Sequence, residues 1–122
     1  MCNMLISINP EHVENIFNGS KKYEYRKIRC KQDIDKIIIY STYPIMKVVG
    51  EAKVEKILED SPDNIWEETK KYSGIDLKFY QKYFKDRSKA IAYKLTNIKK
   101  YSDPKELSSY GIKSAPQSFI YV

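Results

Sequence analysis

The chain has 122 residues, of which 42% are apolar and 31% charged, and this length and composition predict a single globular domain over residues 1–122. It lacks the run of roughly 18 apolar residues that a membrane-spanning helix needs, and its start, MCNMLISINPEH, lacks the basic segment and apolar core of a secretory signal, so we expect a cytoplasmic protein without a membrane partner. The net charge of +6 and the pI of about 9.2 favour an anionic partner, with nucleic acid first among the candidates.

The composition gives little support to metal or redox chemistry. The two cysteines, Cys2 and Cys30, do not form a CxxC pair, and His12 is the one histidine of the chain, so a zinc-binding set cannot be assembled. We interpret both cysteines as small apolar residues and expect no cofactor.

The N-terminal segment predicts a strand followed by a short helix. The apolar run MLISI (residues 4–8) is the strand, after which Asn9 can cap a helix and Pro10 suits its first position. Three apolar side chains then share one helical face: Val13, Ile16 and Phe17. The pair Asn18-Gly19 is typical of a helix end.

The next stretch, GSKKYEYRK, predicts a strand with charged residues on one face. Side chains alternate along a strand, so Tyr23 and Tyr25 point one way while Glu24 and Arg26 point the other. Lys21 falls nominally with the tyrosines, but it follows the Gly-Ser turn directly and can swing toward either face. Two roles are open for the charged pair: a surface salt bridge, which contributes little, or a donor fork and an acceptor presented to a ligand.

The middle of the chain predicts two more strands. DKIIIYST (residues 35–42) is apolar along its length, which is typical of a central strand. KVVGEAKVEKIL (residues 47–58) alternates, with Ala52 and Val54 facing inward. Gly50 within it indicates a bulge or a close approach of another backbone.

Three further helices are predicted from their first residues. Ser61 caps SPDNIWEETKKY, and Asp76 opens DLKFYQKYF, whose aromatic side chains we interpret as core. In DPKELSSYG, Asp103 and Glu106 form a capping box, and Gly111 ends the helix.

Two strands complete the pattern, AIAYKLTNI (residues 90–98) and the terminal PQSFIYV. About six strands with helices between them, and without regular βαβ alternation, predict an α+β fold: a small, mixed or mostly antiparallel barrel, or a strongly curled sheet, flanked by short helices.

The stretch GSKKYEYR also matches G-x-K-x-x-E-x-R, and with it the chain resembles the ASCH domain family of the PUA-like superfamily. LISINPEHVENIFNG is similar to the strand and helix ahead of that motif, and IIIYSTYPIMKVVGEAKVEKIL is similar to the central strand pair after it. SAPQSFIYV resembles the tail of the small stand-alone ASCH proteins labelled predicted transcriptional regulators. The resemblance covers essentially the whole chain and implies a PUA-like β-barrel.

The resemblance also implies a site. The charged residues of the motif line a cleft beside the barrel in this family, and by position they are Lys21, Glu24 and Arg26, placed by Gly19. Beside them we name further ligand-binding candidates in the YSTYP loop and the terminal segment: Ser41, Thr42, Tyr43, Gln117 and Ser118. Three basic residues are candidates for contacts with a nucleic-acid backbone: Arg29, Lys47 and Lys53.

The function that this reading favours is binding of RNA or a modified nucleotide, with DNA left open and a regulatory role implied by the label on similar chains. The alternative is a small hydrolase acting on RNA or, like some ASCH proteins, on acetylated cytidine. Lys21 matches the lysine of those amidohydrolases, but Glu24 occupies the position of their threonine. Glu24 would then act as general base toward water while Lys21 polarises the carbonyl. A protein-interaction role for the exposed part of FYQKYF is the third class, and the sequence does not indicate an oligomeric state.

Overall fold

The computed structural model describes residues 2–122. In chain order the elements are β1 (Cys2–Ile8), α1 (Pro10–Phe17), β2 (Tyr23–Arg26), β3 (Ile34–Ser41), β4 (Lys47–Asp60), α2 (Pro62–Thr69), the 3-10 helix η1 (Lys70–Tyr72), α3 (Leu77–Tyr83), β5 (Ala90–Lys105), the 3-10 helix η2 (Leu107–Tyr110) and β6 (Phe119–Tyr121). Among the residues described, no helix combines the length and apolar character that a membrane span requires.

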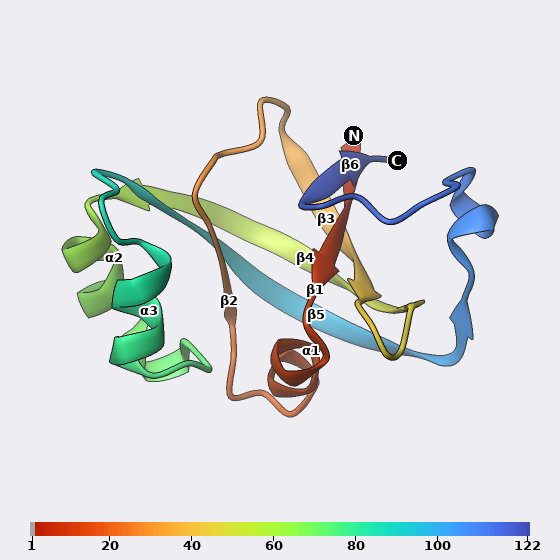
Figure 1. The fold of residues 1–122 in the computed structure, drawn as a ribbon, viewed down its shortest axis with the longest axis horizontal. Helices are drawn as coiled ribbons and strands as arrows, with labels where there is room; N and C mark the ends of the chain where they lie inside the picture. Colours follow the sequence, from red (N-terminus) through yellow and green to blue (C-terminus); the bar gives the residue numbers. More distant parts are fainter. Residues whose placement is uncertain (1) are drawn as a thin grey trace.

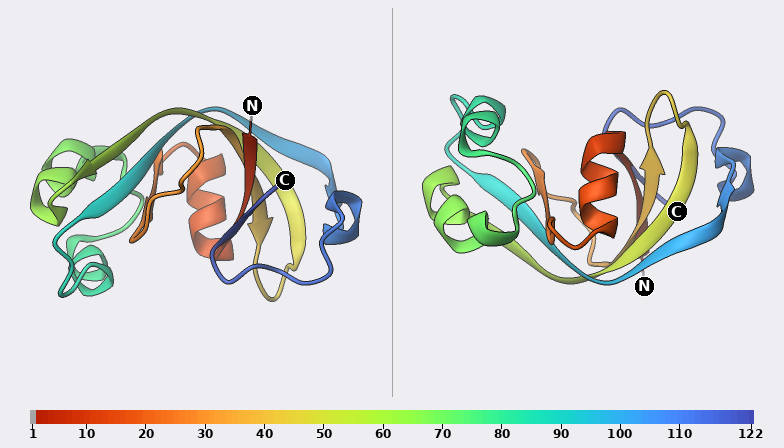
Figure 2. Two further views of the ribbon diagram at one scale, coloured as in Figure 1. Left: turned by 90° about the horizontal axis from the view of Figure 1, so that it is seen from above. Right: turned by 90° about the horizontal axis from the view of Figure 1, so that it is seen from below.

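All the strands belong to a six-stranded sheet with the order β2-β5-β4-β3-β1-β6. β1 and β3 run parallel, and the other neighbouring pairs are antiparallel. The sheet curls strongly: β4 and β5 form an arch, and α1 lies on its concave side next to β2 (Figures 1 and 2). The predicted α+β class, with a curled mixed sheet and short flanking helices, is confirmed.

Bulges in the two long strands account for the curl. The β4–β5 ladder contains three register shifts, and each extra residue adds local twist to the sheet. A side chain at Gly50 in β4 would place its Cβ 2.4 Å from the carbonyl oxygen of Lys99 and 2.7 Å from Cζ of Phe17. The close approach predicted at Gly50 is therefore confirmed, because β5 and α1 both pack against its bare backbone.

The first half of β5 is buried on both faces and separates two apolar clusters. Ile91, Tyr93 and Leu95 join the main core on the concave side, beneath α1. Ala90 and Ala92 point the opposite way, into a second cluster that α2 and α3 cover. The edge strand β2 therefore has an apolar neighbourhood on both of its faces.

Helix starts agree with the prediction more often than not. Ser61 and Asp76 each accept a backbone N–H from the first turn of the helix they cap. Asn9 holds the cap position of α1 without a side-chain cap bond; its Oδ1 accepts a hydrogen bond from the hydroxyl of Thr42 at 3.2 Å instead. This bond ties the start of α1 to the end of β3.

The capping box predicted at Asp103 and Glu106 is wrong. β5 continues through Asp103 to Lys105, because β4 offers it a pairing partner as far as Val48. The helix that follows is the short η2, and Glu106 at its cap position makes no cap bond but pairs with Lys47.

Candidate functional site

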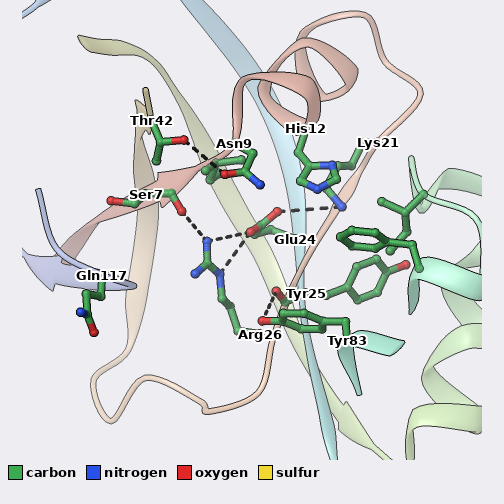
Figure 3. Close-up of a pocket in the computed structure, with 13 residues that line it drawn as sticks. Ser7, Asn9, His12, Lys21, Glu24, Tyr25, Arg26, Thr42, Tyr83 and Gln117 are labelled. Atoms are coloured by element: carbon green, nitrogen blue, oxygen red, sulfur yellow. Dashed lines mark hydrogen bonds and ion pairs between the residues drawn. The ribbon is translucent and has the colours of Figure 1, made fainter. Parts of the chain in front are cut away.

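The motif strand opens onto a cleft on the concave side of the sheet. Its volume is about 330 Å³, at the low end of the range for small-molecule sites. The lining comes from β1, α1, β2, α3 and the loops beside them: Ser7, Ile8, Asn9, His12, Lys21, Glu24, Tyr25, Arg26, Thr42, Ile75, Phe79, Tyr83 and Gln117. Figure 3 shows the Glu24 carboxylate between the Arg26 guanidinium and the Lys21 ammonium.

Strand alternation puts Glu24 and Arg26 on the cleft side of β2. Tyr25 faces the second apolar cluster, and Glu24 is paired across the ladder with Tyr93, whose side chain lies in the main core. The two faces predicted for the strand are thereby confirmed. The charged face is buried, however: Glu24 is 6% exposed, so the pair is not a solvated salt bridge.

Arg26 links the two edges of the curled sheet. Nε and Nη2 donate to Oε2 of Glu24 at 3.1 and 2.9 Å. Nη2 also donates to the carbonyl oxygen of Ser7 on β1 at 2.8 Å, and Nη1 donates to Oγ of Ser118 beside β6 at 3.2 Å. A guanidinium has five N–H groups, and four of these are used within the protein. Arg26 therefore has little left to offer a ligand.

Lys21 supplies the second cation and keeps free donors. Its side chain is 3% exposed, and Nζ donates to the carbonyl oxygen of Ser73 at 3.0 Å while lying 3.9 Å from Oε1 of Glu24 and 4.7 Å from the centre of the Tyr25 ring. An ammonium has three donors, so two remain for the cleft. Burial lowers the pKa of Lys21, and the negative charge of Glu24 offsets part of this shift.

Gly74 makes room for this lysine. Its φ is +68°, and a side chain there would put Cβ 2.4 Å from Cβ of Lys21. Lys21 also forms an isolated β-bridge with Ser73, so the loop before α3 fixes the lysine stem. The sequence left open which face of the strand the Lys21 side chain takes. In the structure it points toward Glu24, because Ser73 and Gly74, far away in the chain, hold its stem.

His12 is a cleft residue that the sequence did not single out as part of the site. Its Nδ1 is buried without a hydrogen-bond partner among the described residues, and its ring meets that of Phe79 edge-on, with centroids 5.4 Å apart. Burial and then the Lys21 charge lower the pKa of His12, so the imidazole is neutral near pH 7. A neutral imidazole can accept or donate one hydrogen bond at that atom.

Aromatic side chains from α3 form one wall. Phe79 is 47% exposed and lines the cleft, and Tyr83 lines it as well, with its hydroxyl donating to the Tyr25 carbonyl oxygen at 3.4 Å. Tyr80 and Phe84 of the same segment are buried in the second cluster. The prediction that these aromatics are core is thus right for Tyr80 and Phe84 and wrong for Phe79.

The other predicted binding residues divide into two groups. Thr42 and Gln117 line the cleft, and Ser118 reaches it indirectly, through Arg26. Ser41 is buried at the end of β3 and Tyr43 is 80% exposed on the following turn; neither lines the cleft.

The three basic residues named for backbone contacts lie away from the cleft. Arg29 pairs with Glu59 at 3.3 Å, Lys47 pairs with Glu106, and Lys53 is exposed on β4. The structure does not gather them into one surface with the cleft. No metal site is evident either: within residues 2–122, no three His, Cys, Asp or Glu side chains cluster closely enough to hold an ion.

The charges of the cleft sum to one excess positive charge. Lys21 and Arg26 are cationic, Glu24 is anionic, and His12 is neutral for the reason given above. Unused hydrogen-bonding capacity remains on the Lys21 ammonium, on Oε1 of Glu24 and on Nδ1 of His12. The cleft can therefore hold a ligand that carries both a negative charge and a donor–acceptor edge.

Comparison with known proteins places this geometry in a family. A model of the ASCH domain matches residues 6–105. The solved structure of ASCH from Zymomonas mobilis superposes with a TM-score of 0.89 at 26% identity, covering 98% of this chain and 87% of that one. A variant of the same protein gives a TM-score of 0.89 at 25% identity.

Curated relatives include longer proteins. The chain is 32% identical over 120 residues, 98% of its length, to ATP synthase subunit alpha of Ureaplasma parvum serovar 3. It is 30% identical over 120 residues to the large ribosomal subunit protein uL22 of the same organism, and 30% identical over 92 residues, 75% of its length, to an ASCH domain-containing ribonuclease of Zymomonas mobilis. The chain spans only 15%, 39% and 62% of the lengths of these three proteins.

Proposed function

This chain belongs to the ASCH domain family, and from that membership and the chemistry of its cleft we propose that it binds RNA by taking one unpaired nucleotide into the cleft. The observation that carries the proposal is the buried cluster of Lys21, Glu24 and Arg26, which has one excess positive charge and faces an aromatic wall. The relative from Zymomonas mobilis named a ribonuclease supports RNA as the ligand class.

Each free group in the cleft has a matching group on a nucleotide. The two free donors of Lys21 suit a phosphate or a base carbonyl, and Oε1 of Glu24 suits an exocyclic amine. Phe79 offers the flat apolar surface on which an unstacked base packs. Arg26 contributes indirectly, because its hydrogen bonds hold the Glu24 carboxylate in place. The ligand contacts are thus assigned to Lys21, Glu24 and Phe79, with Thr42 and Gln117 at the margins.

Cleavage of the bound RNA is the second candidate, favoured by Nδ1 of His12, which has no hydrogen-bond partner within residues 2–122 and lies near the buried Lys21 ammonium (Figure 3). In such a reaction the ribose 2′-oxygen attacks the phosphorus and the bond to the 5′-oxygen breaks. His12 or Glu24 takes the proton from the 2′-hydroxyl, and Lys21 donates one to the leaving oxygen. Hydrolysis of a modified nucleoside would draw on the same Lys21 and Glu24.

The test is a fluorescence-anisotropy titration of labelled single-stranded RNA and of DNA of the same sequence, with the probe checked on a gel at each endpoint. The variants are Lys21→Gln and Glu24→Gln, and the matched control is Lys56→Gln, since Lys56 is exposed on β4 and lines no cavity near the site. Melting curves establish that every variant is folded.

We expect tight binding by the wild type and the control, with at least about a tenfold loss for Lys21→Gln, since a charged hydrogen bond contributes about 1.5–3 kcal/mol. Equal affinity for Lys21→Gln and Lys56→Gln would mean that charge alone attracts RNA and that the cleft is not the site. A probe cut by the wild type and left intact by Lys21→Gln would establish the cleavage candidate. A wild type that binds neither probe at low salt would redirect the search to modified nucleosides.

A further inference from the structure

The cleft does not end at its aromatic wall. A second cavity of about 580 Å³, here called the outer hollow, adjoins it and is lined by Glu11, His12, Ser20, Lys70, Lys71, Ser73, Gly74, Ile75, Asp76 and Phe79. His12, Ile75 and Phe79 line both cavities. The His12 and Phe79 rings, packed edge to face, are therefore a low partition between them rather than an outer boundary.

The backbone that fixes Lys21 also separates the two cavities. Ser73, whose carbonyl oxygen receives the Lys21 ammonium, and Gly74, which packs on the Lys21 stem, both line the outer hollow. Only the backbone of Ser73 and Gly74 would thus separate a group in the hollow from the Lys21 ammonium of the cleft. The two cavities adjoin the same charged centre.

The size of the cleft makes this continuity important. The cleft volume of about 330 Å³ is at the small end for a ligand site. A nucleic-acid strand with one nucleotide in the cleft must therefore place its next nucleotide outside the cleft. Phe79 is 47% exposed and present in both walls. Its ring is in a position to stack with bases on both sides of the partition.

The charges of the outer hollow suit a nucleotide of a strand better than a free anion. Lys70 pairs with Glu67 at 2.7 Å, and the Asp76 carboxylate is occupied by the Phe79 N–H at 2.7 Å. Glu11 is an exposed carboxylate in the lining. Among the residues described, Lys71 is the lining lysine without an ion-pair partner. The lining holds two lysines, Lys70 and Lys71, against two carboxylates, Glu11 and Asp76, so it has no net charge and exerts no net pull on a phosphate alone.

From this arrangement we infer that the ligand of the cleft is a single strand and not a free nucleoside: the outer hollow takes a second nucleotide, Phe79 lies between the two bases, and Lys71 contacts a phosphate. The inference rests on the proposed RNA-binding function and specifies its substrate class. It also places His12 at the step between the two nucleotides, where the connecting phosphodiester passes.

The experiment is a competition assay in which unlabelled mononucleotide, dinucleotide and trinucleotide displace a labelled hexamer of uridylate. Stacking on one aromatic face contributes a factor of about 5 to 150 per base, so for the wild type we expect the dinucleotide to compete at least about fivefold better than the mononucleotide. Phe79→Ala should remove this advantage, and Phe79→Tyr, which keeps an aromatic face, should retain it.

Lys71→Gln and Lys56→Gln supply a matched pair in which the same charge is removed inside and outside the hollow. Lys71→Gln should weaken hexamer binding, lower the slope of log affinity against log salt by about 0.7 and leave mononucleotide competition unchanged. Lys56→Gln should change none of these. Equal competition by mononucleotide and dinucleotide, or equal behaviour of the two variants, would overturn the inference while one-nucleotide binding stands. A hexamer that does not bind the wild type overturns the proposed function itself.

Discussion

Replacing Arg26 by methionine tests whether its guanidinium is structural. The change keeps an unbranched stem and removes all four hydrogen bonds to Glu24, Ser7 and Ser118. Glu24 would keep only Lys21 at 3.9 Å as a counter-charge. The side chains of Arg26 and Glu24 are 14% and 8% exposed, so water entering from the cleft can replace the lost partner only in part.

The expected cost is about 3–5 kcal/mol, the range for removing one partner of a buried ion pair. Unfolding entropy near 2.1 cal/mol/K per residue gives about 0.26 kcal/mol/K for the 122 residues of this chain. The melting temperature of Arg26→Met should therefore fall by roughly 12–20 °C. A loss of that size is a large part of a total stability of about 5–15 kcal/mol.

Urea unfolding followed by the fluorescence of Trp66, the one tryptophan of the chain, measures the effect, since Trp66 packs against the second apolar cluster. The double variant Glu24→Leu, Arg26→Met removes both charges of the pair and should recover part of the loss; the buried Lys21 ammonium then keeps the Ser73 carbonyl oxygen as its partner. A cost for Arg26→Met below about 1 kcal/mol would be that of an exposed pair. That result would refute the structural role and return Arg26 to the ligand contacts.

Three further changes test the fold and the titration of the cleft. Gly50→Ala forces a Cβ against the Lys99 carbonyl oxygen and should lower the free energy of unfolding by about 1–3 kcal/mol; an unchanged urea midpoint would contradict the close approach. The Thr69 hydroxyl donates to a backbone carbonyl, so the Tyr25 hydroxyl, 2.7 Å away, donates to the Thr69 oxygen. Thr69→Val leaves the Tyr25 hydroxyl unpaired and should lower the free energy of unfolding by about 1–3 kcal/mol. The loss should be smaller in a Tyr25→Phe background. The pKa of His12 is lowered in the folded state, so below about pH 6.5 the unfolded chain takes up a proton first and the folded state loses stability as pH falls. Relative to His12→Gln, the wild type should therefore lose stability between pH 7.5 and pH 5. Parallel stability curves for the two proteins would show that His12 titrates normally.

The charged face of β2 was predictable because strand periodicity is local. Once the stretch is a strand, Glu24 and Arg26 must share a face, and the structure has them 2.9 Å apart. The sequence could not show that this face is buried, because its neighbours Ser7 and Ser118 come from the two ends of the chain. That burial turns a weak surface pair into a structural link.

Other parts of the site depend on contacts that no local pattern reports. His12 lies on α1 and Phe79 on α3, and they meet only because both helices pack beside β2. A half-apolar helix with many aromatics gives no sign of which ring stays exposed. Ser73 and Gly74, which direct the Lys21 side chain, likewise show no pattern in the sequence that indicates this role. The signal that could have been used is a polar histidine four residues before Ile16, and so on the same side of the helix as that buried residue.

The wrong capping box has the same origin. Asp, Pro and Glu at that spacing are a sound local indication of a helix start, but β4 is long enough to offer its ladder as far as Val48. Each added backbone pair in the sheet competes with a single helical turn whose nucleation is costly. The tertiary partner therefore decides, and the helical tendency survives only in η2, which ends at Gly111 in a left-handed conformation with φ of 73°.

In the binding mode proposed above, the two cations of the motif divide structural support and ligand binding between them. Arg26 is planar, with its donors directed to three places at once, which suits the fixed gap between β2 and the β1–β6 edge. Lys21 carries a compact charge on an unbranched stem, gives one donor to the Ser73 carbonyl oxygen, and keeps two donors free. Exchanging the two residue types would therefore fail in both places: a lysine at position 26 could not make the bonds to Ser7 and Ser118 together, and an arginine at position 21 would fill the cleft that the ligand needs. Glu24 lies between them and holds the structural cation with Oε2; in the proposed binding mode its Oε1 contacts the ligand, and the short strand therefore gives two positions to charge.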